Sequence, residues 1–372
     1  MDLKAHPQRI VFLDYLRAFA CLTVIIVHSS EFFYIGSEHP LTIAPGDNLW
    51  VSIFDSMFRA AVPLFVMASS YLLVPLQYDT ATFFRRRFKR VVIPFIIWLI
   101  LYAFVPQYGT SWSDTAACNN PFGICFNFPP VAGHLWFVYM LLGVYLLMPI
   151  ISPWIKTLTK RGEETFIAVW ALTTLVPYLR LLTIDGYLYG EAIWNEFSLF
   201  WYISGYIGYV VLAHYIRTYI DWSWRKTLAV AVPVFLAGYA ITAGWFYGYA
   251  ETIGASENGA ILGDMQQLGE IEIGWRFCTI NVAMMAFAIF IVFKKFTCDK
   301  GAVWKVVSDI SRVSYGMYLM HIFILTAVFR LTSGYFPSTP ACIFGVAIIT
   351  YVITYLAAKA LSFLPGGKYI VG

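Results

Sequence analysis

One apolar stretch, residues 9–31, carries four side chains beyond Arg9 that can hold charge or move protons, namely Asp14, Arg17, His28 and Glu31. Eleven positions separate Arg17 from His28, about three helical turns and roughly 16 Å along a helix axis, so both side chains share one face. Asp14 lies three residues before Arg17, and Glu31 lies three residues after His28, so each carboxylate can pair with its neighbour on that face. Ionisable groups in hydrocarbon are costly, and a helix that keeps them is expected to use them.

An imidazole titrates near neutral pH, so it can both take up and release protons under physiological conditions. His28 is therefore a candidate general base, with Glu31 fixing its tautomer and Asp14 positioning Arg17. The alternative is structural: Asp14 and Arg17 form a pair near one membrane interface, while His28 reaches the other interface.

A dense basic run, Arg-Arg-Arg-Phe-Lys-Arg at 85–90, directly precedes Val-Val-Ile-Pro. Arginine forks match phosphate oxygens in a bidentate manner, so Arg85, Arg87 and Arg90 are predicted to bind a phosphate-bearing ligand. The alternative is that these charges set topology and contact anionic headgroups, at about 1 kcal/mol each.

Two further motifs combine histidine with aromatic side chains. His134 and Trp136 lie in Gly-His-Leu-Trp-Phe, where the aromatic ring could stack on a sugar or anchor the chain at the interface. Tyr318 and His321 share a helix face in Tyr-Gly-Met-Tyr-Leu-Met-His, and His321 could be catalytic or simply buried and hydrogen-bonded. All four are candidates for contacting a second substrate or supporting the residues that do.

The cysteines predict one disulfide and no metal site. Cys118 and Cys125 lie in one short loop, on the side of the membrane that is oxidising in bacteria. No histidine or cysteine pair accompanies them at zinc-ligand spacing.

Composition places the chain in a membrane. Of 372 residues, 60% are hydrophobic and 12% charged, against about 45–50% and 25% in soluble domains. This excludes a soluble or nucleic-acid-binding protein, and we expect no cleavable signal peptide. The expected fold is all-α and polytopic, with hydropathy predicting ten transmembrane helices. They span residues 10–30, 54–76, 91–108, 135–153, 165–182, 197–215, 227–249, 276–294, 313–333 and 341–363.

Charge alternates between the connecting loops. Segments 31–53, 109–134, 250–275 and 334–340 contain no lysine or arginine, whereas the loops between them are basic. The positive-inside rule therefore predicts that both termini are cytoplasmic, which requires an even number of spans. The acidic residues of 250–275, Glu272 among them, are interpreted as a solvated surface.

The motifs together resemble the acyltransferase-3 family of integral membrane O-acyltransferases. Asp14-Tyr15-Leu16-Arg17, followed by His28, is similar to that family's first-helix motif. The residues Arg85, Arg87, Arg90 and Pro94 resemble its basic motif. The segments His134–Phe137 and Tyr315–His321 are similar to its later signatures. One departure is Ser70, which stands where the family usually has glycine.

The resemblance implies one transmembrane acyltransferase domain over 1–372, a stand-alone member without a C-terminal esterase-like domain, in the bacterial cytoplasmic (inner) membrane. It implies an acyl group, most often acetyl, moving from cytoplasmic acyl-CoA to a hydroxyl of an extracytoplasmic glycan or lipid-linked saccharide. Acyl-CoA would be a co-substrate, with no permanently bound cofactor. Arg85, Arg87 and Arg90 would hold the donor and His28 would act on the hydroxyl, with an acyl-histidine intermediate left open.

Two other functions fit parts of the pattern. A glycan or small-molecule transporter without acyl transfer would also place charges inside a helical bundle. The lack of a convincing internal repeat weakens that interpretation. A lipid-binding structural subunit is the third possibility, and it would tolerate the loss of His28.

Overall fold

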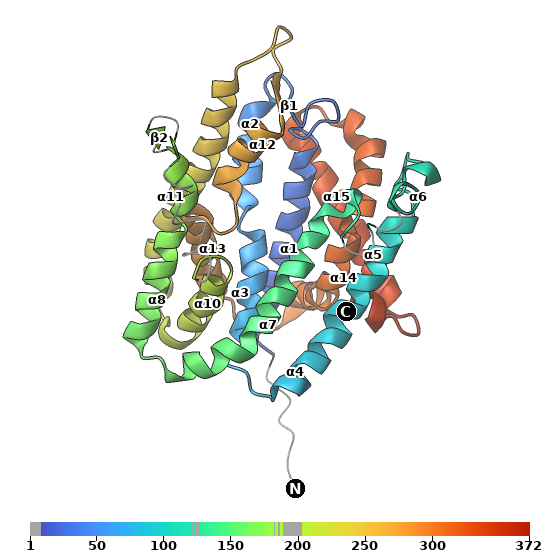
Figure 1. The fold of residues 1–372 in the computed structure, drawn as a ribbon. Helices are drawn as coiled ribbons and strands as arrows, with labels where there is room; N and C mark the ends of the chain where they lie inside the picture. The colour runs from blue at the N-terminus through green and yellow to red at the C-terminus, as the bar shows by residue number, and fades with distance from the viewer. Residues whose placement is uncertain (1–8, 121–122, 124–126, 182, 185–186, 189–202) are drawn as a thin grey trace.

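The computed structural model describes residues 9–120, 123, 127–181, 183–184, 187–188 and 203–372. They form a helical bundle with two short pairs of strands (Figure 1). The α-helices are α1 (Val11–Glu31), α2 (Asp47–Phe58), α3 (Ala61–Leu73), α4 (Thr80–Arg87), α5 (Ile93–Phe104), α6 (Ala116–Asn119), α7 (Trp136–Thr157), α8 (Lys160–Thr173), α10 (Ile207–Tyr219), α11 (Trp224–Ile253), α12 (Met265–Ile271), α13 (Ile280–Phe293), α14 (Gly301–Thr332), α15 (Thr339–Ser362) and α16 (Lys368–Val371).

Short turns of other helix types join several of these helices. The π-helical turn is η1 (Phe88–Val92), and the 3₁₀ turns are η2 (Trp112–Asp114), η4 (Pro130–Leu135), η5 (Val176–Leu181), η7 (Glu272–Trp275) and η8 (Ser333–Tyr335). The strands are β1 (Leu41–Ile43), β2 (Thr183–Ile184), β3 (Tyr187–Leu188) and β4 (Ile261–Gly263). β1 pairs antiparallel with β4 and β2 with β3, so the expected all-α architecture holds apart from these ribbons.

Seven helical stretches of the described chain are long and apolar enough to cross a membrane. Three other predicted spans correspond to shorter helices. α5 covers only part of 91–108, α8 begins before 165, and α10 follows residues outside the described part. The count of ten therefore stays a prediction, as does the cytoplasmic placement of both termini.

Several predicted boundaries were wrong. The span 54–76 is two helices, α2 and α3, that meet at Arg59 and Ala60. α14 begins at Gly301, twelve residues before the predicted start at 313, because Lys305, Asp309 and Arg312 lower the mean hydropathy of its first turns. The span 10–30 agrees closely with α1.

α1 is the central helix of the bundle and contacts α2, α3, α13, α14 and α15 (Figure 1). Its apolar side chains Leu13 and Leu16 are fully buried. Because hydrophobic burial contributes little between helices in lipid, close packing and hydrogen bonds between helices hold such a bundle. The hydroxyl of Ser29 donates to the carbonyl of Ile343 at 2.9 Å, and that of Tyr351 donates to the carbonyl of Ala18 at 3.0 Å. Both bonds tie α15 to α1, and so fix the helix that carries Arg17 and His28.

The basic segment contains a local widening of the helix. α4 and α5 are joined through the π turn η1, and Pro94 follows immediately in the first turn of α5. Proline has no N–H to donate to the carbonyl four residues earlier, which belongs to Arg90, and its ring crowds that carbonyl. A π turn relieves this conflict, so the sequence itself explains why the helix widens at Arg90.

A close contact between α8 and α10 provides a test of how these helices pack. A Cβ on Gly208 of α10 would lie 2.0 Å from Cδ2 of Trp170, whereas one on Gly143 of α7 would meet nothing within 4 Å. We expect Gly208→Ala to lower the free energy of unfolding by about 1–3 kcal/mol through overpacking. Gly143→Ala should leave it unchanged or slightly raised, because alanine favours the helix. Thermal unfolding in detergent measures both, and equal midpoints for the two variants would contradict the packing described.

Candidate active site

The two ends of α1 face different cavities of the described chain. We call the first the basic cavity; it has a volume of about 120 Å³ and is lined by residues that include Arg17, Ser69, Arg90, Tyr145, Ser311 and Arg312. The second, the central chamber, has about 230 Å³ and is lined by His28, Glu31, Arg59, His134, Trp136 and Glu272 among others. A wider vestibule of about 1020 Å³ shares His28, Glu31, His134 and Trp136 with the chamber and also contacts Arg330. Arg17 and His28 thus lie on the same helix but line two different cavities.

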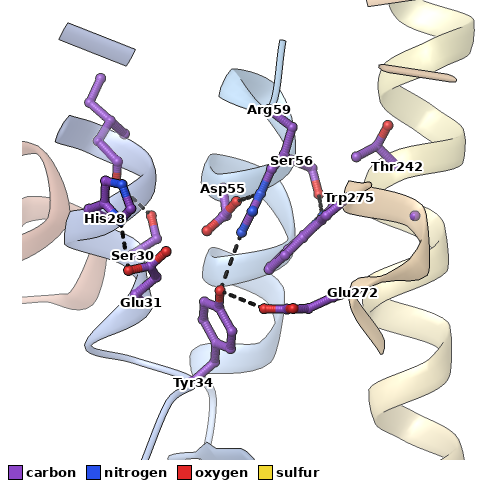
Figure 2. Close-up of polar contacts among 12 residues, drawn as sticks. His28, Ser30, Glu31, Tyr34, Asp55, Ser56, Arg59, Thr242, Glu272 and Trp275 are labelled. Atoms are coloured by element: carbon purple, nitrogen blue, oxygen red, sulfur yellow. Dashed lines mark hydrogen bonds and ion pairs between the residues drawn. The ribbon is translucent and has the colours of Figure 1, made fainter. Parts of the chain in front are cut away.

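His28 and Glu31 form the predicted pair at the end of α1. The Nδ1 atom of His28 lies 2.8 Å from Oε2 of Glu31 (Figure 2). A carboxylate at Nδ1 holds the proton there and leaves Nε2 as the basic nitrogen. Nε2 makes no hydrogen bond to any described residue, and the side chain lines both the chamber and the vestibule. This arrangement suits a group that takes a proton from a substrate.

Two more histidines lie beside His28. The ring centroids of His28 and His321 are 5.2 Å apart, and those of His321 and His134 are 4.9 Å apart. Nδ1 of His321 lies 2.5 Å from the carbonyl oxygen of Tyr318, and Tyr318 donates its hydroxyl to the carbonyl oxygen of His134. Of the predicted residues, His134, Trp136 and Tyr318 therefore line the chamber, and His321 is fully buried beside His28 and His134, although the four come from η4, α7 and α14. No group of described residues is arranged to hold a metal ion.

Arg59 anchors a polar network on the opposite wall of the chamber. Its Nε donates to Asp55, and its Nη2 donates to the hydroxyl of Tyr34 at 3.3 Å (Figure 2). Tyr34 in turn donates to Oε1 of Glu272 at 3.1 Å, and the Arg59 guanidinium stacks 4.1 Å over the ring of Trp275. Burial holds the pKa of Tyr34 well above its usual range, so this hydroxyl stays a donor.

Sequence reasoning missed much of this wall. Glu272 was interpreted as part of a solvated acidic loop, but it lines the chamber and is engaged by Tyr34. The β1–β4 pairing fixes the loop that follows α1, and Tyr34 and Trp275 pack beside it, with their ring centroids 5.3 Å apart. The sequence showed only that Glu272 lies close to a predicted membrane span. That position does not reveal that Tyr34 would be its hydrogen-bond partner.

At the other end of α1, Asp14 makes shorter contacts than the predicted one. Its Oδ1 lies 4.0 Å from Nη1 of Arg17, but it accepts from the hydroxyl of Ser311 at 2.5 Å, and Oδ2 accepts from Nε of Arg9 at 2.6 Å. Asp14 therefore joins α1 to α14 and only loosely positions Arg17.

The three predicted phosphate ligands are placed differently. Arg90 lines the basic cavity together with Arg17. The guanidinium of Arg87 lies 5.9 Å from the ring centroid of Tyr145, and its buried Nε has no hydrogen-bond partner among the residues that the structure describes. Arg85 is exposed and does not line the cavity. Arg90 and Arg17 thus line the same cavity, whereas Arg85 lies outside that cavity.

The predicted disulfide between Cys118 and Cys125 cannot be placed, because Cys125 lies outside the described residues; Cys118 is exposed.

Comparison with known proteins gives one match. The model of a family described as an acyltransferase domain covers residues 10–359, nearly the whole chain. No curated protein and no solved structure shows significant similarity.

The Arg59 network provides a test of the chamber wall. Asp55 is fully buried and is the carboxylate paired directly with Arg59, so Asp55→Ala would leave a buried guanidinium without its counterion. We expect this variant to lose about 3–5 kcal/mol of stability. Asp221→Ala is the matched control, because Asp221 is exposed and its pair with Lys295 spans 3.6 Å. Unfolding midpoints in detergent should fall for the first variant only; an unchanged midpoint for Asp55→Ala would contradict the pairing.

Proposed function

Because the chain belongs to the acyltransferase-3 family of membrane acyltransferases, we propose that it acylates a hydroxyl of an extracytoplasmic glycan or lipid-linked saccharide. The donor is cytoplasmic acyl-CoA, most simply acetyl-CoA, and the protein resides in a bacterial inner membrane. The observation that carries this proposal is the pair of cavities along α1. Arg17, Arg90 and Arg312 line the first cavity, and His28, whose Nε2 has no hydrogen-bond partner among the described residues, lines the second, towards the other end of the same helix.

The basic cavity supplies the donor's phosphate contacts. Arg17, Arg90 and Arg312 all line it, and neither Arg17 nor Arg90 has a carboxylate within 3.5 Å among the described residues. Arginine is suited to phosphate because its fork binds two oxygens at once. The nucleotide part of acyl-CoA would bind at this end, and the pantetheine arm would extend along α1 towards His28.

His28 carries the proton during the transfer. The acceptor oxygen attacks the thioester carbonyl carbon, and Nε2 of His28 takes the hydroxyl proton as the C–O bond forms. The intermediate then collapses, the C–S bond breaks, and the proton passes to the sulfur, giving the free thiol of CoA. Glu31 keeps Nδ1 protonated and stabilises the imidazolium that exists between the two steps.

The acceptor would arrive through the vestibule. This wide space opens onto His28 and Glu31 and contains both polar and aromatic side chains. Trp136 stands at the boundary of vestibule and chamber, where its ring could stack on a sugar. The transporter alternative is not favoured by the family match.

The role of His28 is tested with labelled acetyl-CoA and membranes that contain the protein. We expect His28→Ala to abolish transfer of label to the glycan fraction while the amount of protein in the membrane is unchanged. His39→Ala is the control, because His39 is exposed in the loop after α1 and should retain full activity. Retained transfer in His28→Ala would remove His28 from the mechanism. Unmodified substrate crossing the membrane, with no label on glycan, would indicate transport.

The donor site is tested by a matched pair of arginines from the same basic run. Arg90 lines the basic cavity and Arg85 does not. A hydrogen bond to a charged group contributes about 1.5–3 kcal/mol, so Arg90→Ala should raise the KM for acetyl-CoA about tenfold or more. Arg85→Ala should change it less than about twofold, because Arg85 does not line the cavity. Equal effects of the two substitutions, measured as initial rates against acetyl-CoA concentration, would refute the proposed phosphate site.

A further inference from the structure

Two aromatic side chains line both the basic cavity and the central chamber. Phe137, in the first turn of α7, and Tyr318, on α14, contribute to the walls of each space. Arg17 lines the basic cavity and His28 lines the central chamber, about three helical turns away along α1. Any group that passes from the basic cavity to His28 therefore meets this ring pair.

The two rings pack against each other in the wall that the two cavities share. Their centroids are 5.1 Å apart at an interplanar angle of 66°, and the exposed fractions of the two residues are only 5% and 6%. This is the edge-to-face contact of a packed aromatic pair. An acyl group that reaches His28 from the basic cavity must displace or slide past one of the rings.

The two rings are not held equally. Tyr318 is fixed by its hydroxyl, which donates to the carbonyl oxygen of His134. Phe137 has no polar atom and is held by contacts with other rings, such as that of Phe65 at a centroid distance of 6.0 Å. Phe137 is therefore the side chain that can change the width of the passage without breaking a hydrogen bond.

We propose that Phe137, packed against Tyr318, sets the length of acyl chain that the protein transfers, and that it admits acetyl and excludes longer chains. This proposal rests on the proposed function, because it requires acyl-CoA to enter at the basic cavity. It goes beyond that function by assigning donor specificity to one residue. The chamber of about 230 Å³ must also admit the acceptor hydroxyl, so a long chain that passed the rings would compete with the acceptor for this space.

The test compares acetyl-CoA with butanoyl-CoA in membranes that contain the full chain. The readout is the ratio of kcat/KM for butanoyl to kcat/KM for acetyl, with labelled acyl groups counted on the glycan fraction. One methylene in a tight pocket changes discrimination by about tenfold or more, so Phe137→Ala should raise this ratio at least about tenfold. Phe137→Leu should raise it by a smaller factor, because it removes less of the ring.

A matched control separates the passage from general loosening of the fold. Phe323 lies on α14, five positions after Tyr318, and stacks on Tyr102 at 4.1 Å without lining either cavity. Phe323→Leu should leave the ratio unchanged even if it lowers stability. Should Phe137→Ala fail to accumulate in the membrane, Phe137→Leu decides the question by itself.

The outcomes distinguish this proposal from the proposed function. If the unsubstituted protein transfers neither acyl group, the proposed function fails. If it transfers acetyl and the Phe137 variants keep the same ratio, only the proposal about Phe137 is overturned. A protein that already uses butanoyl-CoA as well as acetyl-CoA would overturn it too.

Discussion

The cost of charge in an apolar bundle governs the arrangement of this site. A buried ionisable group must find a partner or face a space where water or a ligand can reach it. Arg59 meets this requirement through Asp55, and Asp14 meets it through Arg9 and Ser311. Arg17 is half-buried and only 4.0 Å from Asp14 at its nearest carboxylate oxygen, Arg90 is exposed, and both border a cavity. The arginines that border the cavity therefore mark where an anionic ligand is expected, whereas the close Arg59–Asp55 pair is structural.

One helix sets the distance between the two halves of the site. α1 runs without interruption from Val11 to Glu31, so the separation of Arg17 and His28 depends only on helix geometry. Hydrogen bonds from α15 and the Ser311–Asp14 contact from α14 hold the helix in place. Such a rigid spacer can position a donor at one end and a proton acceptor at the other without a loop between them.

The sequence predicted the parts of this arrangement that lie on single helices. Arg17, His28 and Glu31 follow from helical spacing, and the His28–Glu31 contact was found as predicted. Contacts between distant segments were not predictable. Glu272 and Tyr34 meet because β1 pairs with β4 and brings two loops together, and neither loop shows this in its own pattern. Hydropathy also could not show that one helix ends and another begins at Arg59. The end of α2 before Arg59 and the start of α3 after it are both apolar.

The basic run shows why composition alone overstates a binding site. Five cations in six residues suggest a cluster, but a helix turns its residues through 100° each, so they cannot all face one cavity. The π turn before Pro94 changes the rotation of the chain at this point, and Arg90 emerges beside Arg17. Arg85, on the straight part of α4, remains exposed, where its charge can interact with headgroups. The run is thus divided between the cavity, which Arg90 lines, and the surface, where Arg85 lies, and the π turn that includes Arg90 joins α4 to α5.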